Sequence, residues 1–372
     1  MTTAAGRAFH TLLDVLRDAD QTFLVGPRAD MDALGVAEGY RHLTHLLGYA
    51  FDLYLEGDAE RPVFTPLAAP TRKMLGDNVD SLYHFAPLRG DRRYRIRGRR
   101  GNEVYLAFCV YGGKPDGEWS ERVVANLSQR DMRCDADGAF EIILAAEPLA
   151  RPSPAATPEA RPSPAGASAP NVITLAPDAV CVIVRQYFLD RADLRPAHFV
   201  IEALDPAPAP PPLDDATLAR RLGAVATFVR ETIQFAPLPS GLPPNLLGPP
   251  MPWNPNVPGW GTPDNMYSLG LFRLESDEAL VIEGRSPRCV YFGAQLWNRY
   301  MQSLDYRYHR VSLNASEIVF EPDGSFRLVV AHRDPGMPNW LDTAGHREGV
   351  VFCRWLQAEA TPEHPASRVI RI

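Results

Sequence analysis

Apolar residues recur at helical spacing near the start of the chain and at strand spacing further on. Over residues 7–57 they return every three or four positions, which predicts a helical N-terminal segment. From Asp80 the period falls to two, and runs such as 104–110 predict β-strands. Helical spacing returns over 214–234, where Asp214 or Asp215 can cap the helix. The pattern therefore predicts a mainly β protein with helices at its start and between two strand-rich segments.

The two strand-rich segments share the sequence pattern I-x-G-R-x5-Y. It begins at Ile96 and again at Ile282, an offset of 186 (282 − 96). Tyr105 and Tyr291 pair at the same offset. Other identical residues pair at shifted offsets: Asp80 with Asp264 and Tyr83 with Tyr267 at 184 (264 − 80), Asn171 with Asn339 at 168 (339 − 171), and Arg185 with Arg354 at 169 (354 − 185). Many short strands separated by turn residues are typical of sandwiches. We therefore predict two related antiparallel, jelly-roll-like β-sandwich units, in which shared positions are framework and unshared positions are candidates for function.

Changes in composition divide the chain into four parts. We predict a helical segment over 1–60, a first sandwich over 61–205, a linker helix with a proline-rich wrap over 206–260, and a second sandwich over 261–372. Within the first sandwich, residues 148–170 repeat Ala-Arg-Pro-Ser-Pro-Ala and have no apolar content to order them. This stretch is predicted to be a disordered surface loop.

Charge and cysteine usage narrow the class of partner and the compartment. A net charge of −7 disfavours a nucleic-acid or anionic-membrane partner, because both prefer a basic face. The leading residues lack a signal-peptide core, and no apolar run reaches the roughly 20 residues of a membrane span. Five cysteines lie far apart with no C-x-x-C motif. Reduced cysteines in a cytoplasmic protein are the interpretation that fits.

The second copy carries four ionisable side chains that the first copy lacks. They lie on one predicted strand–loop–strand segment: His332, Asp334, Asp342 and His346. A loop of about ten residues can bring its ends together. Three interpretations stay open: ligands of a divalent metal, acid–base catalysis by a metal-free His–Asp pair, or a structural corner built on the turn former Asp-Pro-Gly.

A second possible metal arrangement lies on the N-terminal helix. Glu38, His42 and His45 share one helix face, which is typical either of metal ligands or of a polar helix surface. The sequence contains no P-loop and no G-x-G-x-x-G, so no nucleotide cofactor is expected.

Polar and aromatic residues of the second copy also predict a ligand site. Alternation places Gln295 and Trp297 on one strand face, where an indole beside an amide can stack a flat ring or a sugar. The full predicted ligand-binding set is Gln295, Trp297, Asn298, Asn339, Trp340 and Arg354. The alternative is a half-buried strand without a ligand.

The stretch from Asp334 to Trp355 resembles a known family signature. It reads Asp-Pro-Gly-x-Pro-Asn-Trp-Leu-Asp-Thr-x-Gly and ends in Arg-Trp. This pattern is similar to that of the domain-of-unknown-function family 1214, and the upstream copy resembles the region that often precedes it. The resemblance implies a β-sandwich architecture and no settled activity.

The residues of the second copy suggest two main hypotheses for the function of the protein. The first is a cytoplasmic enzyme that acts on a small organic molecule through the histidines and acids of the second copy. The alternative is a non-catalytic protein that binds a glycan or another small ligand. A structural or interaction role for the proline-rich loop is the third possibility, and the sequence leaves the oligomeric state open.

Overall fold

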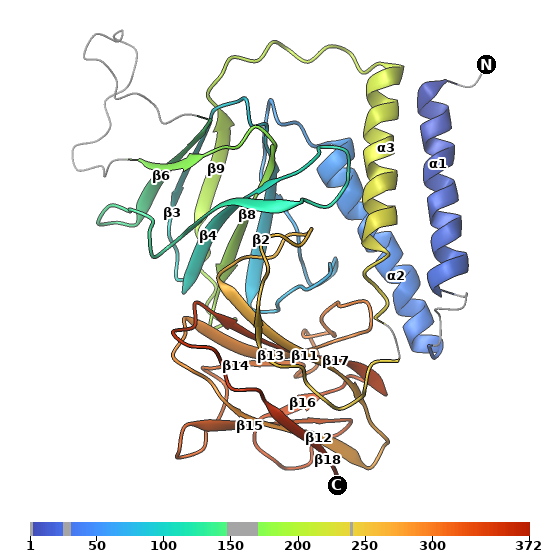
Figure 1. The fold of residues 1–372 in the computed structure, drawn as a ribbon, viewed down its shortest axis with the longest axis vertical. Helices are drawn as coiled ribbons and strands as arrows, with labels where there is room; N and C mark the ends of the chain where they lie inside the picture. The colour runs from blue at the N-terminus through green and yellow to red at the C-terminus, as the bar shows by residue number, and fades with distance from the viewer. Residues whose placement is uncertain (1–2, 25–30, 147–169, 239–240) are drawn as a thin grey trace.

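Each half of the chain folds into a β-sandwich of one five-stranded and one four-stranded sheet (Figure 1). The computed structural model describes residues 3–24, 31–146, 170–238 and 241–372. The first sandwich lies above the second in Figure 1, and three α-helices run beside the first. The predicted mainly β fold, with two related sandwich units, an N-terminal helical segment and a linking helix, is confirmed.

The strands of the two halves correspond to one another in chain order, from β1 and β10 to β9 and β18. The first half contains β1 (Thr65–Pro66), β2 (Ser81–Pro87), β3 (Tyr94–Arg99), β4 (Tyr105–Gly112), β5 (Arg122–Ser128), β6 (Ala139–Ala145), β7 (Asn171–Thr174), β8 (Ala179–Tyr187) and β9 (His198–Ala203). The second contains β10 (Met251–Pro252), β11 (Asn265–Arg273), β12 (Glu278–Arg285), β13 (Tyr291–Trp297), β14 (Ser312–Asn314), β15 (Ser325–Ala331), β16 (Trp340–Asp342), β17 (Glu348–Leu356) and β18 (Ala366–Arg371).

The two sandwiches have one topology. The five-stranded sheets run β1-β2-β8-β4-β5 and β10-β11-β17-β13-β14, and the four-stranded sheets run β7-β6-β3-β9 and β16-β15-β12-β18. The register agrees as well, since Ile96 pairs with Ile142 and Ile282 pairs with Leu328. The tandem duplication predicted from the sequence is therefore present in the strand pairing.

A shared asparagine forms the same corner in each sandwich. Asn339 accepts from the backbone N–H of Val319 and donates to the carbonyls of Val319 and Arg327 at 2.8 and 3.0 Å. Asn171 makes the equivalent three bonds to Arg133 and Glu141, which are the counterparts of Val319 and Arg327 in the first copy. One amide thus holds a loop against a strand edge, and this explains why both copies keep an asparagine here.

Strand alternation builds a dry core inside each sandwich. On β8, Val182 and Val184 point into the first core, and on β17, Val351 and Cys353 point into the second. Residues in between point out of the sandwich, because successive strand side chains face opposite ways. The outward faces of the five-stranded sheets are the surfaces on which the remaining elements pack.

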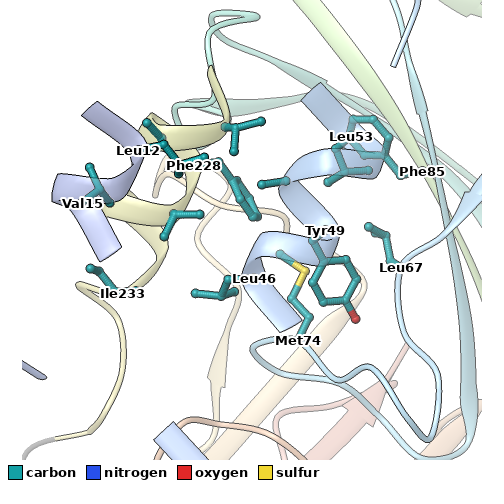
Figure 2. Packing of buried hydrophobic residues seen from close by; sticks show 14 of the residues in the cluster. Leu12, Val15, Leu46, Tyr49, Leu53, Leu67, Met74, Phe85, Phe228 and Ile233 are labelled. Atoms are coloured by element: carbon teal, nitrogen blue, oxygen red, sulfur yellow. The ribbon is translucent and has the colours of Figure 1, made fainter. Parts of the chain in front are cut away.

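A helical layer covers one part of the outward face of the first five-stranded sheet, and the second sandwich meets the other part. The layer consists of α1 (Ala4–Ala19), α2 (Ala33–Ala50) and α3 (Asp215–Thr232), with π-helical turns η1 (Asp20–Leu24) and η2 (Phe51–Leu55) after the first two. Figure 2 shows Leu12, Leu46 and Phe228 from the three helices in one apolar cluster, and Phe85 of β2 lies next to Leu53 of η2 at the side of the cluster that faces the sheet. The helices therefore add a third layer to the first sandwich.

The two acids at the start of α3 have different tasks. Asp214 caps α3 by accepting from the backbone N–H of Thr217 at 2.7 Å. Asp215 accepts instead from the N–H groups of Ala4 and Ala5, at 2.8 and 2.9 Å, and so satisfies free donors at the start of α1. The helix predicted over 214–234 is confirmed, and its second acid ties two helices together.

The predicted disordered loop over 148–170 lies outside the described residues, except for the exposed Pro170. Among the described residues, none of the helices combines the length and apolar character that crossing a membrane requires.

Candidate ligand-binding cavity

The two sandwiches meet through the outward faces of their five-stranded sheets. Arg185 and Tyr187 point outward from β8, and Phe352 and Arg354 point outward from β17. Between these faces lies a cavity of about 480 Å³. Its size falls within the range of small-molecule sites, roughly 300–1,000 Å³.

Aromatic side chains from both halves and the linker form much of the cavity wall. The main ones are Trp119, Tyr187, Trp253, Trp260, Tyr267 and Trp297. Trp297 stacks on Phe352 with ring centroids 4.0 Å apart. Aromatic walls of this kind suit the apolar or flat body of a ligand.

Two buried arginines occupy equivalent positions on opposite sides of the cavity. Arg185 is 5% exposed and Arg354 is 6% exposed. Arg354 donates to the carbonyl of Gly76 at 3.0 Å, and Arg185 donates to the carbonyl of Trp260. Trp260 is the counterpart of Gly76 in the register that pairs Asp80 with Asp264. Each repeat therefore reaches across and binds the same loop carbonyl of the other repeat.

Neither arginine forms an ion pair with a carboxylate among the described residues. In the described part of the chain, no carboxylate oxygen lies within 4.0 Å of either guanidinium. Asp77 also lines the cavity and interacts with Arg354 through space, while its carboxylate accepts from the backbone N–H and hydroxyl of Ser303 at 2.8 and 2.5 Å. Buried charges in proteins are normally paired, so this pair of cations is exceptional.

Several polar atoms in the cavity wall also lack partners among the described residues. They are Nη1 of Arg185, Nε of Arg354, Nε1 of Trp119 and Oδ1 of Asn265. Three of the four are donors. A buried donor without an acceptor points to a group that the protein itself does not supply.

The arginines change the chemistry of the tyrosines beside them. Arg354 donates to the hydroxyls of Tyr187 at 3.1 Å and Tyr83 at 3.3 Å. Burial alone would raise the pKa of Tyr187, but the charges of Arg354 and Arg185 outweigh burial and lower that pKa below its ordinary value. For Tyr83 burial prevails, and the pKa is raised. The cavity is therefore a region of positive potential around Tyr187.

A reciprocal pair of hydrogen bonds joins the halves next to the cavity. Tyr105 of the first repeat donates to Asp264 of the second at 2.7 Å, and Tyr291 of the second donates to Asp80 of the first at 2.7 Å. Such exchange of equivalent contacts is the mark of a two-fold interface, here between repeats of one chain. The cavity thus lies at a pseudo-symmetric junction.

The four predicted catalytic residues do not share a site. His332 is held by the Thr343 hydroxyl at 2.8 Å and the carbonyl of Leu274 at 3.1 Å, so both of its ring nitrogens are occupied. Asp334 accepts from the N–H two residues on, at 2.8 Å, and forms the exposed turn that was its alternative interpretation. The predicted convergence of the four side chains on one site is not observed, because each of them bonds to a different set of residues.

The other two predicted catalytic residues have different partners again. Asp342 lies 2.8 Å from Nδ1 of His309, and its second oxygen accepts from the N–H of Ala344 at 2.8 Å. Nδ1 of His346 donates to a backbone carbonyl at 2.9 Å, and its Nε2 lies 3.1 Å from Glu38. Burial would lower the pKa of His346, but Glu38 outweighs burial and raises it. A His–Asp pair and a His–Glu pair exist, at separate places.

The metal arrangements suggested by the sequence are not formed either. His42 is buried against Tyr300, and neither of its ring nitrogens has a hydrogen-bond partner in the described part of the chain. Nδ1 of His45 accepts from the N–H of Lys73 at 3.2 Å. Across residues 3–24, 31–146, 170–238 and 241–372, no three His, Cys, Asp or Glu side chains gather as metal ligands do. The helix face was correctly predicted, but its members serve packing and pairing.

Of the six predicted ligand-binding residues, Trp297 and Arg354 line the cavity. Gln295 and Trp297 do share a face, and both donate to the carbonyl of Asp77, at 2.7 and 3.1 Å. Asn298 accepts from the N–H groups of its own turn, and Trp340 donates to the carbonyl of Ala331 at 3.1 Å outside the cavity. Asn339 is the structural corner described above.

The cavity residues that the sequence analysis missed include Arg185, Tyr187, Trp119, Trp253 and Trp260. A signal for the first was present, because Arg185 and Arg354 are an outward-facing arginine at the same position of both repeats. In the sequence analysis this shared arginine is assigned to the framework, because every position that both copies share is treated as framework. A cavity at a pseudo-symmetric junction takes its residues from shared positions, so sharing does not argue against function here.

Fold and site together define a tandem β-sandwich protein with a cationic, aromatic cavity between its repeats. The crystal structure of an uncharacterised protein from Burkholderia cenocepacia is 33% identical, covers 98% of this chain and 97% of that chain, and has a TM-score of 0.84. The chain belongs to the same family as that protein. The VPA0106 protein of Vibrio parahaemolyticus, at 12% identity, 89% coverage of this chain, 97% of that chain and a TM-score of 0.51, shares the fold. No protein-family model and no curated protein matches the sequence.

Proposed function

We propose that the protein binds a small organic anion with an apolar body in the cavity between its two sandwiches. The observation that carries this proposal is the pair of buried guanidiniums of Arg185 and Arg354, neither of which forms an ion pair with a described carboxylate, although Asp77 also lines the cavity. An unpaired buried ion costs several kcal/mol relative to water. A ligand carboxylate or phosphate would offset that cost, since charge-assisted hydrogen bonds each contribute about 1.5–3 kcal/mol.

The rest of the cavity indicates the body of the ligand. Its wall is mostly aromatic and aliphatic, and most of its polar groups already have partners inside the protein. A neutral glycan would bring many hydroxyl groups that need hydrogen-bond partners, and the four atoms of the wall that lack a partner among the described residues are too few to satisfy them. An aromatic or alkyl acid fits better, because its body can be buried against rings while its anion meets the arginines.

The test is a binding measurement with matched probes. Calorimetric titration with 2-naphthoate and decanoate should show binding, whereas the neutral 2-naphthamide and decanol should bind at least tenfold more weakly. Arg185→Met and Arg354→Met should each weaken the acids at least tenfold, about 1.4 kcal/mol. Arg92→Met, at an arginine paired with Glu60, is the control and should leave affinity unchanged.

Two results would count against the proposal. One is equal affinity for the acids and their neutral analogues. The other is undiminished binding in both arginine variants, which would mean that the anion lies elsewhere.

Catalysis in the same cavity is the second candidate function, and Tyr187 is the observation in its favour. Its hydroxyl accepts from Arg354, and the two arginine charges lower its pKa, which suits it to exchange a proton with the carbon next to the carboxylate of a bound ligand. Deuterium exchange into the carbon next to the carboxylate, followed by NMR in D₂O, tests this. Exchange that is lost in Tyr187→Phe while affinity persists would favour an enzyme over a binding protein.

A further inference from the structure

A second cavity of about 490 Å³ adjoins the central one. It lies between α3, the turn η2 and the outward face of the first sheet, with Leu53, Phe85 and Val180 among its apolar walls. The two cavities have one described wall residue in common, Trp260. Its ring contacts Phe85 of the second cavity, with centroids 5.7 Å apart, and Trp119 of the central cavity, with centroids 4.7 Å apart, so the indole lies between two spaces of nearly equal size.

The indole of Trp260 is held in place on several sides. Its Nε1 donates to the hydroxyl of Ser120 at 3.0 Å. Its ring meets Trp119 edge-on at 4.7 Å and lies nearly parallel to Phe228 at 5.9 Å, with an interplanar angle of 22°. A ring fixed in this way by one hydrogen bond and aromatic contacts is a firm partition.

The same residue also positions one of the two arginines. The backbone carbonyl of Trp260 accepts from Arg185, so the residue whose indole lies between the cavities also holds one of the arginines that would bind the anion. Removing the indole leaves this carbonyl in place. A side-chain substitution can therefore open the wall without removing the acceptor that holds Arg185.

We propose that Trp260 sets the upper length of the ligand's apolar body by closing the central cavity off from the second one. This inference rests on the proposed function, since it concerns the same bound anion. Without the indole, the two cavities would join into one space about twice as large. A longer chain could then pass from the arginines into the apolar part of the second cavity.

A series of straight-chain carboxylates from hexanoate to hexadecanoate tests the proposal by calorimetric titration. In the wild-type protein, affinity should rise about fourfold for each buried methylene until the central cavity is full, and then stop rising. In Trp260→Leu the rise should continue for several more carbons. The ratio of hexadecanoate to decanoate affinity should increase at least tenfold.

Controls separate the partition from general loosening. Trp340→Leu removes a half-buried indole outside both cavities and should leave the length limit unchanged. Thermal unfolding checks that each variant is folded, and Trp260→Phe, which keeps a ring, carries the test with a smaller shift if Trp260→Leu does not fold. An unchanged length limit in the folded Trp260 variant overturns the partition. Failure of every carboxylate to bind the wild-type protein would instead sink the proposed function itself.

Discussion

Replacing Tyr291 by phenylalanine should destabilise the junction between the sandwiches, because it removes a hydrogen bond to a buried charge. The lost hydroxyl donates to the carboxylate of Asp80 at 2.7 Å. Asp80 is only 2% exposed, so water cannot replace the lost donor. Loss of a hydrogen bond to a charged group costs about 1.5–3 kcal/mol, and we expect about 2 kcal/mol here. Asn314 at 3.2 Å and Arg191 at 3.3 Å remain to hold the carboxylate, which keeps the loss within that range.

The cost should also depend on pH, with a defined sign. Burial raises the pKa of Asp80, and the Tyr291 hydroxyl opposes that rise. When the pKa of an acid is higher in the folded protein than in the unfolded chain, the protein loses stability as the pH rises above the ordinary pKa of that acid. The reason is that the unfolded chain ionises first. The variant lacks the opposing hydroxyl, so its deficit relative to wild type should be larger at pH 8 than at pH 4.5.

Urea unfolding at both pH values measures the two effects, and Tyr105→Phe supplies the matched comparison. Tyr105 makes the equivalent bond to Asp264, but Asp264 is only half-buried and keeps a donor from Asn126 at 2.8 Å. Its loss should cost about 1 kcal/mol. Equal losses in the two variants, or a Tyr291→Phe deficit that does not change with pH, would refute the reasoning.

Two other predictions follow from the described contacts. Asn339→Ala should destabilise the fold by about 1 kcal/mol more than Asn171→Ala. Both variants lose three hydrogen bonds, but Asn339 also has a φ of 58°, at which alanine is strained. Equal midpoints of the two variants in chemical unfolding would contradict this prediction. Burial lowers the pKa of His42 to about 3. As pH falls below 6.5, wild type should therefore lose up to ~1.4 kcal/mol per unit more stability than His42→Phe, in which only other histidines with a lowered pKa, such as His45 and His84, still contribute. Parallel pH profiles of unfolding for the two proteins would disprove this.

Much of the fold could be predicted from the sequence because its causes are local. Strand alternation places residues such as Val182 inside and Arg185 outside regardless of what packs nearby. The repeated pattern around Ile96 and Ile282 revealed two copies of one unit, and identical strand orders bear this out. The turn at Asp334 was also foreseeable, since an aspartate two residues before a glycine bonds to the N–H it can reach.

The site depended on contacts that no local pattern contains. His332 and His346 are close in sequence, but one faces Thr343 and the other finds Glu38, on a helix near the start of the chain. Arg185 and Arg354 belong to different repeats and share a cavity only because the two sheets meet through their outward faces. The sequence by itself determined the elements, the duplication and the sidedness of each strand. Only tertiary packing decided which outward side chains face one another, since burial and pairing arise between elements rather than within them.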